Sequence, residues 1–221
     1  DLGIEVPYND VPTIQKMLIK KANLKGIPVI TATQMLLSMT QNERATRAEI
    51  SDVANAVLDG TDVVMLSEES AVGEDPINVV DTMHNIIAKT EGIYNYDKQY
   101  EMPYLDEFDV IQATVTKLAD DLKANGILAI TSSGKSALKM SRYRPRTPIF
   151  TFTHKKKVLN SLTAIWGVEP IGIIKEAQAS KMFQKMLKSL DEIGKLKKDG
   201  LYVATVGYPV GMPGSTNTIK I

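Results

Sequence analysis

The sequence predicts an α/β protein that consists of an incomplete parallel sheet followed by a small open α/β domain. Short apolar segments alternate with amphipathic segments of helical period, which is typical of a parallel sheet with helices on its faces. The charge also changes along the chain, because residues 1–110 carry 19 acidic and 8 basic side chains whereas residues 111–221 carry 7 and 18. We therefore expect two units with different surfaces.

The first half is predicted to contain three helices and two buried strands. Thr46 and Glu49 fit a capping box, in which each side chain satisfies the backbone N–H of the other residue. Gly26 and Gly60 each follow a predicted helix end. In order, the elements are a helix over 12–26, a strand over 27–30, a helix over 46–60, a strand over 62–66 and a helix from 75–76 onwards. The side chains expected on the buried faces of the helices are Ile14, Met17, Leu18, Ala22, Ile50, Val53, Ala54, Val57, Val80, Met83 and Ile87.

Two strands are too few for an independent sheet, because they cannot cover both faces and both edges. The polar segments 31–44 and 67–75 are expected to be loops and supply no further strand. The chain also begins with Asp1 rather than Met. We therefore expect a fragment of a longer protein.

The second half is predicted to be a small open α/β domain of ordinary size. A tyrosine-rich acidic segment precedes it, so we expect a first unit over 1–92, a linker over 93–107 and a second domain over 108–221. Its expected strands are 127–130, 149–152, 170–173, 201–206 and 217–221. Its expected helices begin near residues 111, 135, 155 and 182.

Composition excludes several classes of site. The chain has no Cys, which excludes disulfides, iron–sulfur clusters and thiol catalysis, and its two His residues are far apart in sequence. Hydrophobic residues make up 43% and charged residues 24%, as in globular proteins. No apolar run approaches the roughly 20 residues that span a bilayer, and no signal peptide is visible. We expect a soluble cytoplasmic protein.

The sharpest local motif lies between a predicted strand and a predicted helix. It consists of Thr131, Ser132, Ser133, Gly134, Lys135 and Ser136. Hydroxyls, a flexible glycine, a lysine and the free N–H groups of a helix N-terminus together favour a phosphate. A nucleotide-hydrolase P-loop is excluded, because Ala129 stands where that motif needs glycine. An ordinary serine-rich helix cap remains the alternative.

Two further segments are open to more than one interpretation. The Gly- and Pro-rich segment 207–217 could fold over a ligand or simply connect the last two strands. The basic run 142–146, together with Lys155, Lys156 and Lys157, lacks the aromatic interleaving of an RNA-binding module. We expect a solvated face or a subunit contact there, and no binding of nucleic acid.

Polar side chains follow both strands predicted in the first half. Thr31, Thr33 and Gln34 follow the first strand, and Glu68 and Glu69 belong to the loop after the second. Ligand sites of parallel α/β sheets lie at that end of the strands. Hydroxyl side chains at that end could bind a carboxylate or a phosphate, and carboxylate side chains could bind a metal ion. Neither group of side chains is specific for a function by itself.

Taken together, several segments resemble the pyruvate kinase family over essentially the whole chain. The matching segments are 1–5 (DLGIE), 28–36 (PVITATQML), 46–49 (TRAE), 51–60 (SDVANAVLDG) and 142–145 (RYRP). The resemblance implies that residues 1 to about 90 end a TIM barrel, from the tail of strand six through helix eight, and that the C-terminal domain follows. It implies a homotetrameric glycolytic enzyme that transfers phosphate from phosphoenolpyruvate to ADP, giving pyruvate and ATP, with Mg²⁺ or Mn²⁺ and K⁺.

The resemblance also implies roles for individual residues. Asp1 is then a ligand of the divalent metal, Thr33 contacts the substrate, and Arg47 lies in a subunit contact near a neighbour's active site. In allosteric relatives the loop that matches 131–136 holds a phosphate of a sugar-phosphate effector. The segment that matches 207–217 lacks a basic residue here, so AMP or a hexose monophosphate rivals a bisphosphate as the ligand.

Departures from the family pattern limit what is expected of this polypeptide. Residues 67–70 read Ser-Glu-Glu-Ser where many relatives have Ser-Gly-Glu-Thr, so we assign them no metal role. The other metal carboxylate, the catalytic lysine, the potassium ligands and the lid domain lie upstream in the family. We therefore expect residues 1–221 alone to be inactive. The alternatives are a freestanding phosphate-binding module without catalysis and, from the basic half, a nucleic-acid binder.

Overall fold

The computed structural model describes residues 2–32, 34–97, 101–176, 178–207 and 216–221. Contacts within the chain divide it into two compact units, residues 1–95 and 96–221. The exact limits expected for the linker, 93–107, stay a prediction. No helix in the described part of the chain is long and apolar enough to cross a membrane.

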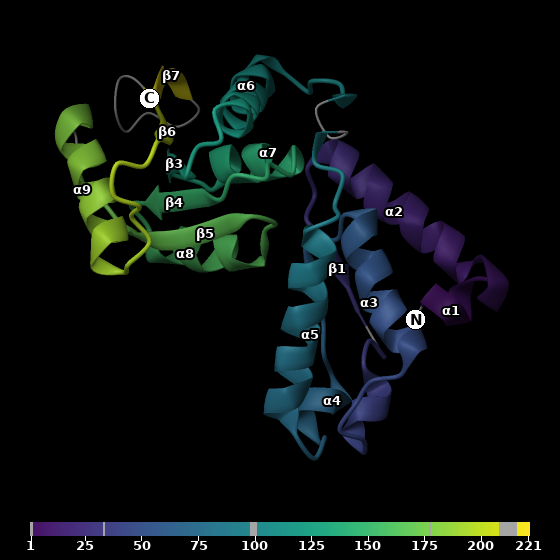
Figure 1. Ribbon diagram of the computed structural model, residues 1–221. Coiled ribbons are helices and arrows are strands. Elements are labelled where there is room, and N and C mark those ends of the chain that lie inside the picture. Colours follow the sequence, from purple (N-terminus) through teal and green to yellow (C-terminus); the bar gives the residue numbers. More distant parts are fainter. Residues whose placement is uncertain (1, 33, 98–100, 177, 208–215) are drawn as a thin grey trace. The chain divides into compact units, whose positions relative to one another are not determined.

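In the first unit, helices surround a short parallel pair of strands (Figure 1). Its elements are α1 (Leu2–Glu5), η1 (Tyr8–Asp10), α2 (Val11–Lys25), β1 (Ile30–Thr31), η2 (Leu37–Thr40), α3 (Arg47–Asp59), β2 (Val63–Val64), α4 (Glu68–Ala71) and α5 (Pro76–Glu91). The expected capping box is confirmed, because Thr46 Oγ1 accepts from Glu49 N and Glu49 Oε2 accepts from Thr46 N. Helices α2 and α3 end at Gly26 and Gly60, as predicted.

Both strands of this unit are shorter than predicted, at two residues each instead of four or five. Ile30 pairs with Val63 and Thr31 with Val64. A strand extends only where its backbone meets a partner, and among the described residues each of these strands has one neighbour. The side chain of Ile30 is consequently 57% exposed.

The segment expected to be a polar loop over 31–44 contributes to the core of the first unit. Met35, Leu36 and Met39 are buried against α3 and α5, where Val53 and Met83 also lie. The expected buried face of α2 is wrong in part, because Met17 and Leu18 are exposed and Ile19 and Asn23 are buried. Asn23 faces inward because its Nδ2 donates to Gly60 O at 2.9 Å.

The second unit is a three-layer α/β structure. Its elements are α6 (Glu107–Asp121), β3 (Gly126–Thr131), α7 (Lys135–Arg142), β4 (Ile149–Thr153), α8 (Lys156–Ser161), η4 (Leu162–Ala164), β5 (Val168–Ile173), α9 (Ala179–Glu192), β6 (Tyr202–Gly207) and β7 (Thr216–Lys220). The sheet order is β5-β4-β3-β6-β7, with β7 antiparallel to β6 and the other pairs parallel.

Alternation along the central strand assigns its residues to two cores. Ile127 and Ala129 belong to the core on the side of α6 and α7. Leu128 packs in the other core, with Met182 and Met186 of α9. Helix α9 thus covers one face of the sheet, and α6, α7 and α8 cover the other (Figure 1).

The chain order of this sheet creates a topological switch point between β3 and β6. From β3 the chain proceeds outward to β4 and β5, and then α9 brings it back to β6 on the other side of β3. In open α/β sheets, ligands bind outside the carboxyl ends of the strands at such a switch point. The loops after β3 and β6 lie at that point.

Candidate functional site

The first candidate site lies where β1 and β2 end. Thr31 Oγ1 donates to Thr61 Oγ1 at 2.9 Å, and Met65 N donates to Thr31 O at 3.0 Å. These bonds fix the last residue of β1 against β2. The loops after the two strands therefore start side by side, as the sequence predicted.

Glu69 joins the two loops. Its side chain is buried, with 1% of the residue exposed, although it belongs to the four-residue helix α4. Oε2 accepts from Ser67 N at 2.7 Å and Oε1 accepts from Leu36 N at 3.4 Å. Nothing in the sequence distinguished Glu69 from the adjacent Glu68, which is exposed.

Glu49 makes a second connection to the loop after β1. Its carboxylate accepts hydrogen bonds from Ser38 N and Ser38 Oγ, at 2.7 and 2.6 Å, in addition to those from Thr46. Partial burial acts to raise the pKa of Glu49, but the hydrogen bonds from Ser38 and Thr46 outweigh it and lower the pKa. The carboxylate therefore stays ionised and holds the loop against α3.

Two predicted site residues, Asp1 and Thr33, lie outside the described residues. Among the residues that the structure describes, no group of three or more His, Asp or Glu side chains is placed to hold a metal ion. The fit of a metal at Asp1 thus stays a prediction.

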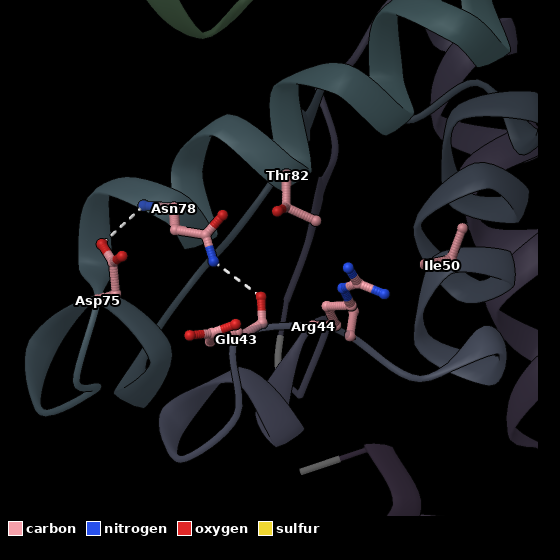
Figure 2. Close-up of a pocket in the computed structure, with 7 residues that line it drawn as sticks. Glu43, Arg44, Ile50, Asp75, Asn78 and Thr82 are labelled. Carbon is pink, nitrogen blue, oxygen red and sulfur yellow. Dashed lines mark hydrogen bonds between the residues drawn. The ribbon is translucent and has the colours of Figure 1, made fainter.

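Arg47 is exposed and is the first residue of α3. The segment before it lines two hollows of about 560 and 550 Å³, which share Glu43, Arg44 and Ala45. The larger hollow is bounded by the start of α5, where Asp75 Oδ1 accepts from Asn78 N and Asn78 Nδ2 donates to Glu43 O (Figure 2). No sequence pattern indicated these hollows.

The second candidate site is the loop between β3 and α7. Gly134 has a left-handed backbone, with φ of 88° and ψ of −13°, and its N–H donates to Thr131 Oγ1 at 2.9 Å. This turn closes the loop and leaves the first N–H groups of α7 directed away from the helix. Ser133 and Lys135 are exposed, whereas Thr131 and Ser136 are buried.

The structure brings the two polar segments of the second unit together. Ser136 Oγ and Thr216 Oγ1 are 3.3 Å apart, so the start of α7 contacts the first residue of β7. Residues 208–215, most of the predicted covering segment, lie outside the described residues. Lys155, Lys156 and Lys157 follow β4 at the same edge of the sheet and are exposed, as expected of a solvated face.

The expectation of a solvated face or subunit contact is wrong for Arg142 and Arg144. Both are buried, at 3% and 2% exposed. Arg142 Nη1 donates to Asp109 Oδ2 at 2.9 Å, and both side chains are fully buried. Arg144 lies over the ring of Trp166, 5.1 Å from its centroid. The sequence around Arg142 shows that the segment is basic but does not show the partner of Arg142, because Asp109 lies 33 positions earlier in the chain.

Tyr143 completes this buried network. Its hydroxyl donates to Asp109 Oδ2 at 2.8 Å and accepts from Arg142 Nη1 at 2.8 Å. Burial, followed by the hydrogen bond to Asp109, raises the pKa of Tyr143 well above its usual range. The hydroxyl therefore remains protonated, and the network anchors the C-terminal end of α7 to α6.

Comparison with known proteins decides the family. The chain matches the models "Pyruvate kinase, barrel domain" over residues 1–80 and "Pyruvate kinase, alpha/beta domain" over residues 109–221. The chain belongs to the pyruvate kinase family. The predicted fold class, the end of a TIM barrel followed by a small α/β domain, is thereby confirmed.

Individual pyruvate kinases align with the whole chain. Identity is 42% to the pyruvate kinase of Lactobacillus delbrueckii subsp. bulgaricus, 43% to that of Clostridium acetobutylicum and 42% to that of Geobacillus stearothermophilus. Each alignment covers 100% of this chain but only 38%, 48% and 38% of the relative. The chain thus spans less than half the length of these relatives.

Proposed function

We propose that this chain forms the end of the catalytic barrel and the C-terminal domain of a pyruvate kinase. The parent enzyme would transfer phosphate from phosphoenolpyruvate to ADP, giving pyruvate and ATP in glycolysis. The observation that carries this proposal is the match of both units, over 1–80 and 109–221, to the two pyruvate kinase domains. A soluble cytoplasmic enzyme belongs to the same proposal.

Phosphoryl transfer depends chiefly on positioning and on stabilisation of charge by cations. The proposal includes Mg²⁺ or Mn²⁺ and K⁺ as cofactors, Asp1 as a ligand of the divalent metal and Thr33 as a substrate contact. The divalent cation would supply charge stabilisation. The chain's own contribution is the fixed edge at which β1 and β2 end, where Glu69 and Glu49 hold the loop after β1.

A polypeptide limited to residues 1–221 is expected to be inactive. It spans 38% of the Lactobacillus enzyme, and two strands of a barrel enclose no active site. Pyruvate formation from phosphoenolpyruvate and ADP, coupled to lactate dehydrogenase, tests this, with the parent protein as the control. Pyruvate production by residues 1–221 above background would contradict the expected inactivity, and a parent without activity would contradict the proposed function.

We further propose that residues 131–136 bind a phosphate of an effector such as a sugar phosphate or AMP. The left-handed Gly134, the position at the switch point and the exposed Lys135 support this site. A ligand that binds only the folded state raises its stability by about 2.7 kcal/mol at a hundredfold excess over the Kd. A freestanding phosphate-binding module without catalysis would use the same loop.

Thermal-shift titration of the chain with fructose 1,6-bisphosphate, AMP, glucose 6-phosphate and ribose 5-phosphate tests the effector site. We expect one ligand to raise the melting temperature and Lys135→Ala to abolish the shift. Lys198→Ala is the matched control, because Lys198 is exposed in the connection that enters β6 from the opposite edge of the sheet. No shift from a cooperatively melting sample, or equal shifts in both variants, would contradict a site at this loop.

A homotetramer with Arg47 in a subunit contact completes the proposal. Arg47 is exposed beside the two hollows lined by residues 43–45, so its side chain is accessible to a partner. Sedimentation of the parent protein with Arg47→Ala tests the contact. An unchanged tetramer dissociation constant would contradict it.

A further inference from the structure

The carboxylate of Glu69 is buried without a basic partner. No salt bridge to Glu69 occurs among the residues that the structure describes, and only 1% of the residue is exposed. A charged carboxylate that leaves water must be hydrogen-bonded to be tolerated. Here the donors are the backbone N–H groups of Leu36 and Ser67, which belong to two different loops.

The two donors flank the edge at which β1 and β2 end. Ser67 is the third residue after β2, and Leu36 is the fifth residue after β1. The β1 loop is already fixed at its start, because Thr31 is bonded to Thr61 and Met65. The Glu69–Leu36 bond fixes it at the other end, so both ends of segment 32–36 are attached to the β2 side.

The backbone of the attached segment is itself constrained. Gln34 has φ of 53°, a left-handed conformation that costs energy for a residue other than glycine. Met35 and Leu36, which follow it, are buried at 5% and 0% exposed. Such a conformation persists only where the surroundings enforce it. The buried side chains and the Glu69 carboxylate supply that enforcement.

We propose that Glu69 is a positioning residue for phosphoryl transfer, because its carboxylate fixes the segment Gln34–Leu36 against the end of β2. The proposal rests on the proposed function, in which Thr33 directly precedes this segment. The two hydrogen bonds of the Glu69 carboxylate come from backbone N–H groups, so the proposed role is to position the loop. This role accounts for the burial of the Glu69 side chain, in contrast to the adjacent Glu68, which is exposed.

The test uses Glu69→Gln in the full-length parent enzyme. The amide is nearly isosteric, but its NH₂ group meets one of the two backbone N–H donors and cannot accept from it. We expect kcat to fall at least tenfold while the KM for ADP stays within twofold. Glu74→Gln is the matched control, because Glu74 is exposed, and we expect it to keep the wild-type kcat.

Hydrogen exchange supplies a readout that does not depend on activity. We expect faster amide exchange in Glu69→Gln in peptides over 34–40 and 66–69, with the peptides of α3 and α5 unchanged. Glu69→Asp, whose shorter side chain reaches one donor at a time, serves if the glutamine variant does not fold, and the same criteria apply to it.

The outcomes separate the positioning role from the proposed function. Wild-type kcat in a folded variant, or faster exchange throughout the first unit, would overturn the positioning role, since the second result means general destabilisation. A wild-type parent enzyme that forms no pyruvate would overturn the proposed function. In that case local exchange at 34–40 would still decide whether Glu69 holds the segment.

Discussion

The buried carboxylate of Asp109 neutralises the equally buried guanidinium of Arg142. Three groups donate to the same oxygen, Asp109 Oδ2: Leu105 N, Arg142 Nη1 and the hydroxyl of Tyr143, at 2.8, 2.9 and 2.8 Å. Asp109→Asn keeps the shape but removes the charge, and Arg142 then remains buried without its counter-ion. Breaking a buried ion pair at one partner costs about 3–5 kcal/mol.

The expected fall in melting temperature follows from this loss of stability and from the number of residues in the second unit. For a domain between 100 and 150 residues, 1 kcal/mol corresponds to roughly 4 °C, so we expect the melting temperature to fall by roughly 12–20 °C. Differential scanning calorimetry of the chain measures the change.

Asp121→Asn on the same helix is the control, because Asp121 is exposed in an i,i+4 pair with Lys117 and solvent screens such a pair, so its loss has little effect on stability. Equal and small shifts in Asp109→Asn and Asp121→Asn would refute the reasoning.

Three further changes have expected outcomes. Because folding lowers the pKa of Glu49, its contribution to stability is complete above about pH 4.3 and is lost as the pH falls through the lowered pKa. Glu49→Gln should therefore flatten the acid side of the profile of stability against pH, measured by urea titration. A profile identical to that of the wild type would contradict this. Gly134→Ala should destabilise the second unit by about 1 kcal/mol, because φ is 88° there, and weaken phosphate binding in the thermal-shift assay; unchanged stability would show that the loop relaxes. Met186→Ala should cost about 2–5 kcal/mol in chemical denaturation, since Met186 on the sheet-facing side of α9 is fully buried. A loss below about 1 kcal/mol would mean that the core collapses around the cavity.

Local patterns predicted the elements of this chain well. The capping box at Thr46 and Glu49, the helix ends at Gly26 and Gly60 and the helix that ends at Arg142 depend on interactions within a few residues. Such interactions are visible in the sequence. The lengths of β1 and β2 were not predictable in this way, because ladder length depends on neighbouring strands.

Burial of polar residues was harder to predict than the elements. The loop 31–44 reads as polar, yet Met35, Leu36 and Met39 anchor it in the core. Arg142 reads as a surface charge, yet Asp109 on another helix makes its burial tolerable. The burial of this loop and the burial of Arg142 depend on partners that are distant in sequence, and so does the burial of Glu69. The loop 131–136 could be identified in the sequence because its polar residues are consecutive, and its role as a phosphate site stays a prediction.

The connection that enters the second unit is attached before α6 begins. Pro103 O accepts from Arg142 Nη2 and Leu105 N donates to Asp109 Oδ2, so Pro103 and Leu105 are bound to the second unit ahead of α6. Arg142 is the last residue of α7, so the bond to Pro103 joins the connection to the C-terminal end of that helix. The opposite end of that helix, about 12 Å away for eight residues, begins at the loop proposed to bind phosphate. Helix α7 therefore joins the anchored end of the connection to the loop that we propose as the phosphate site.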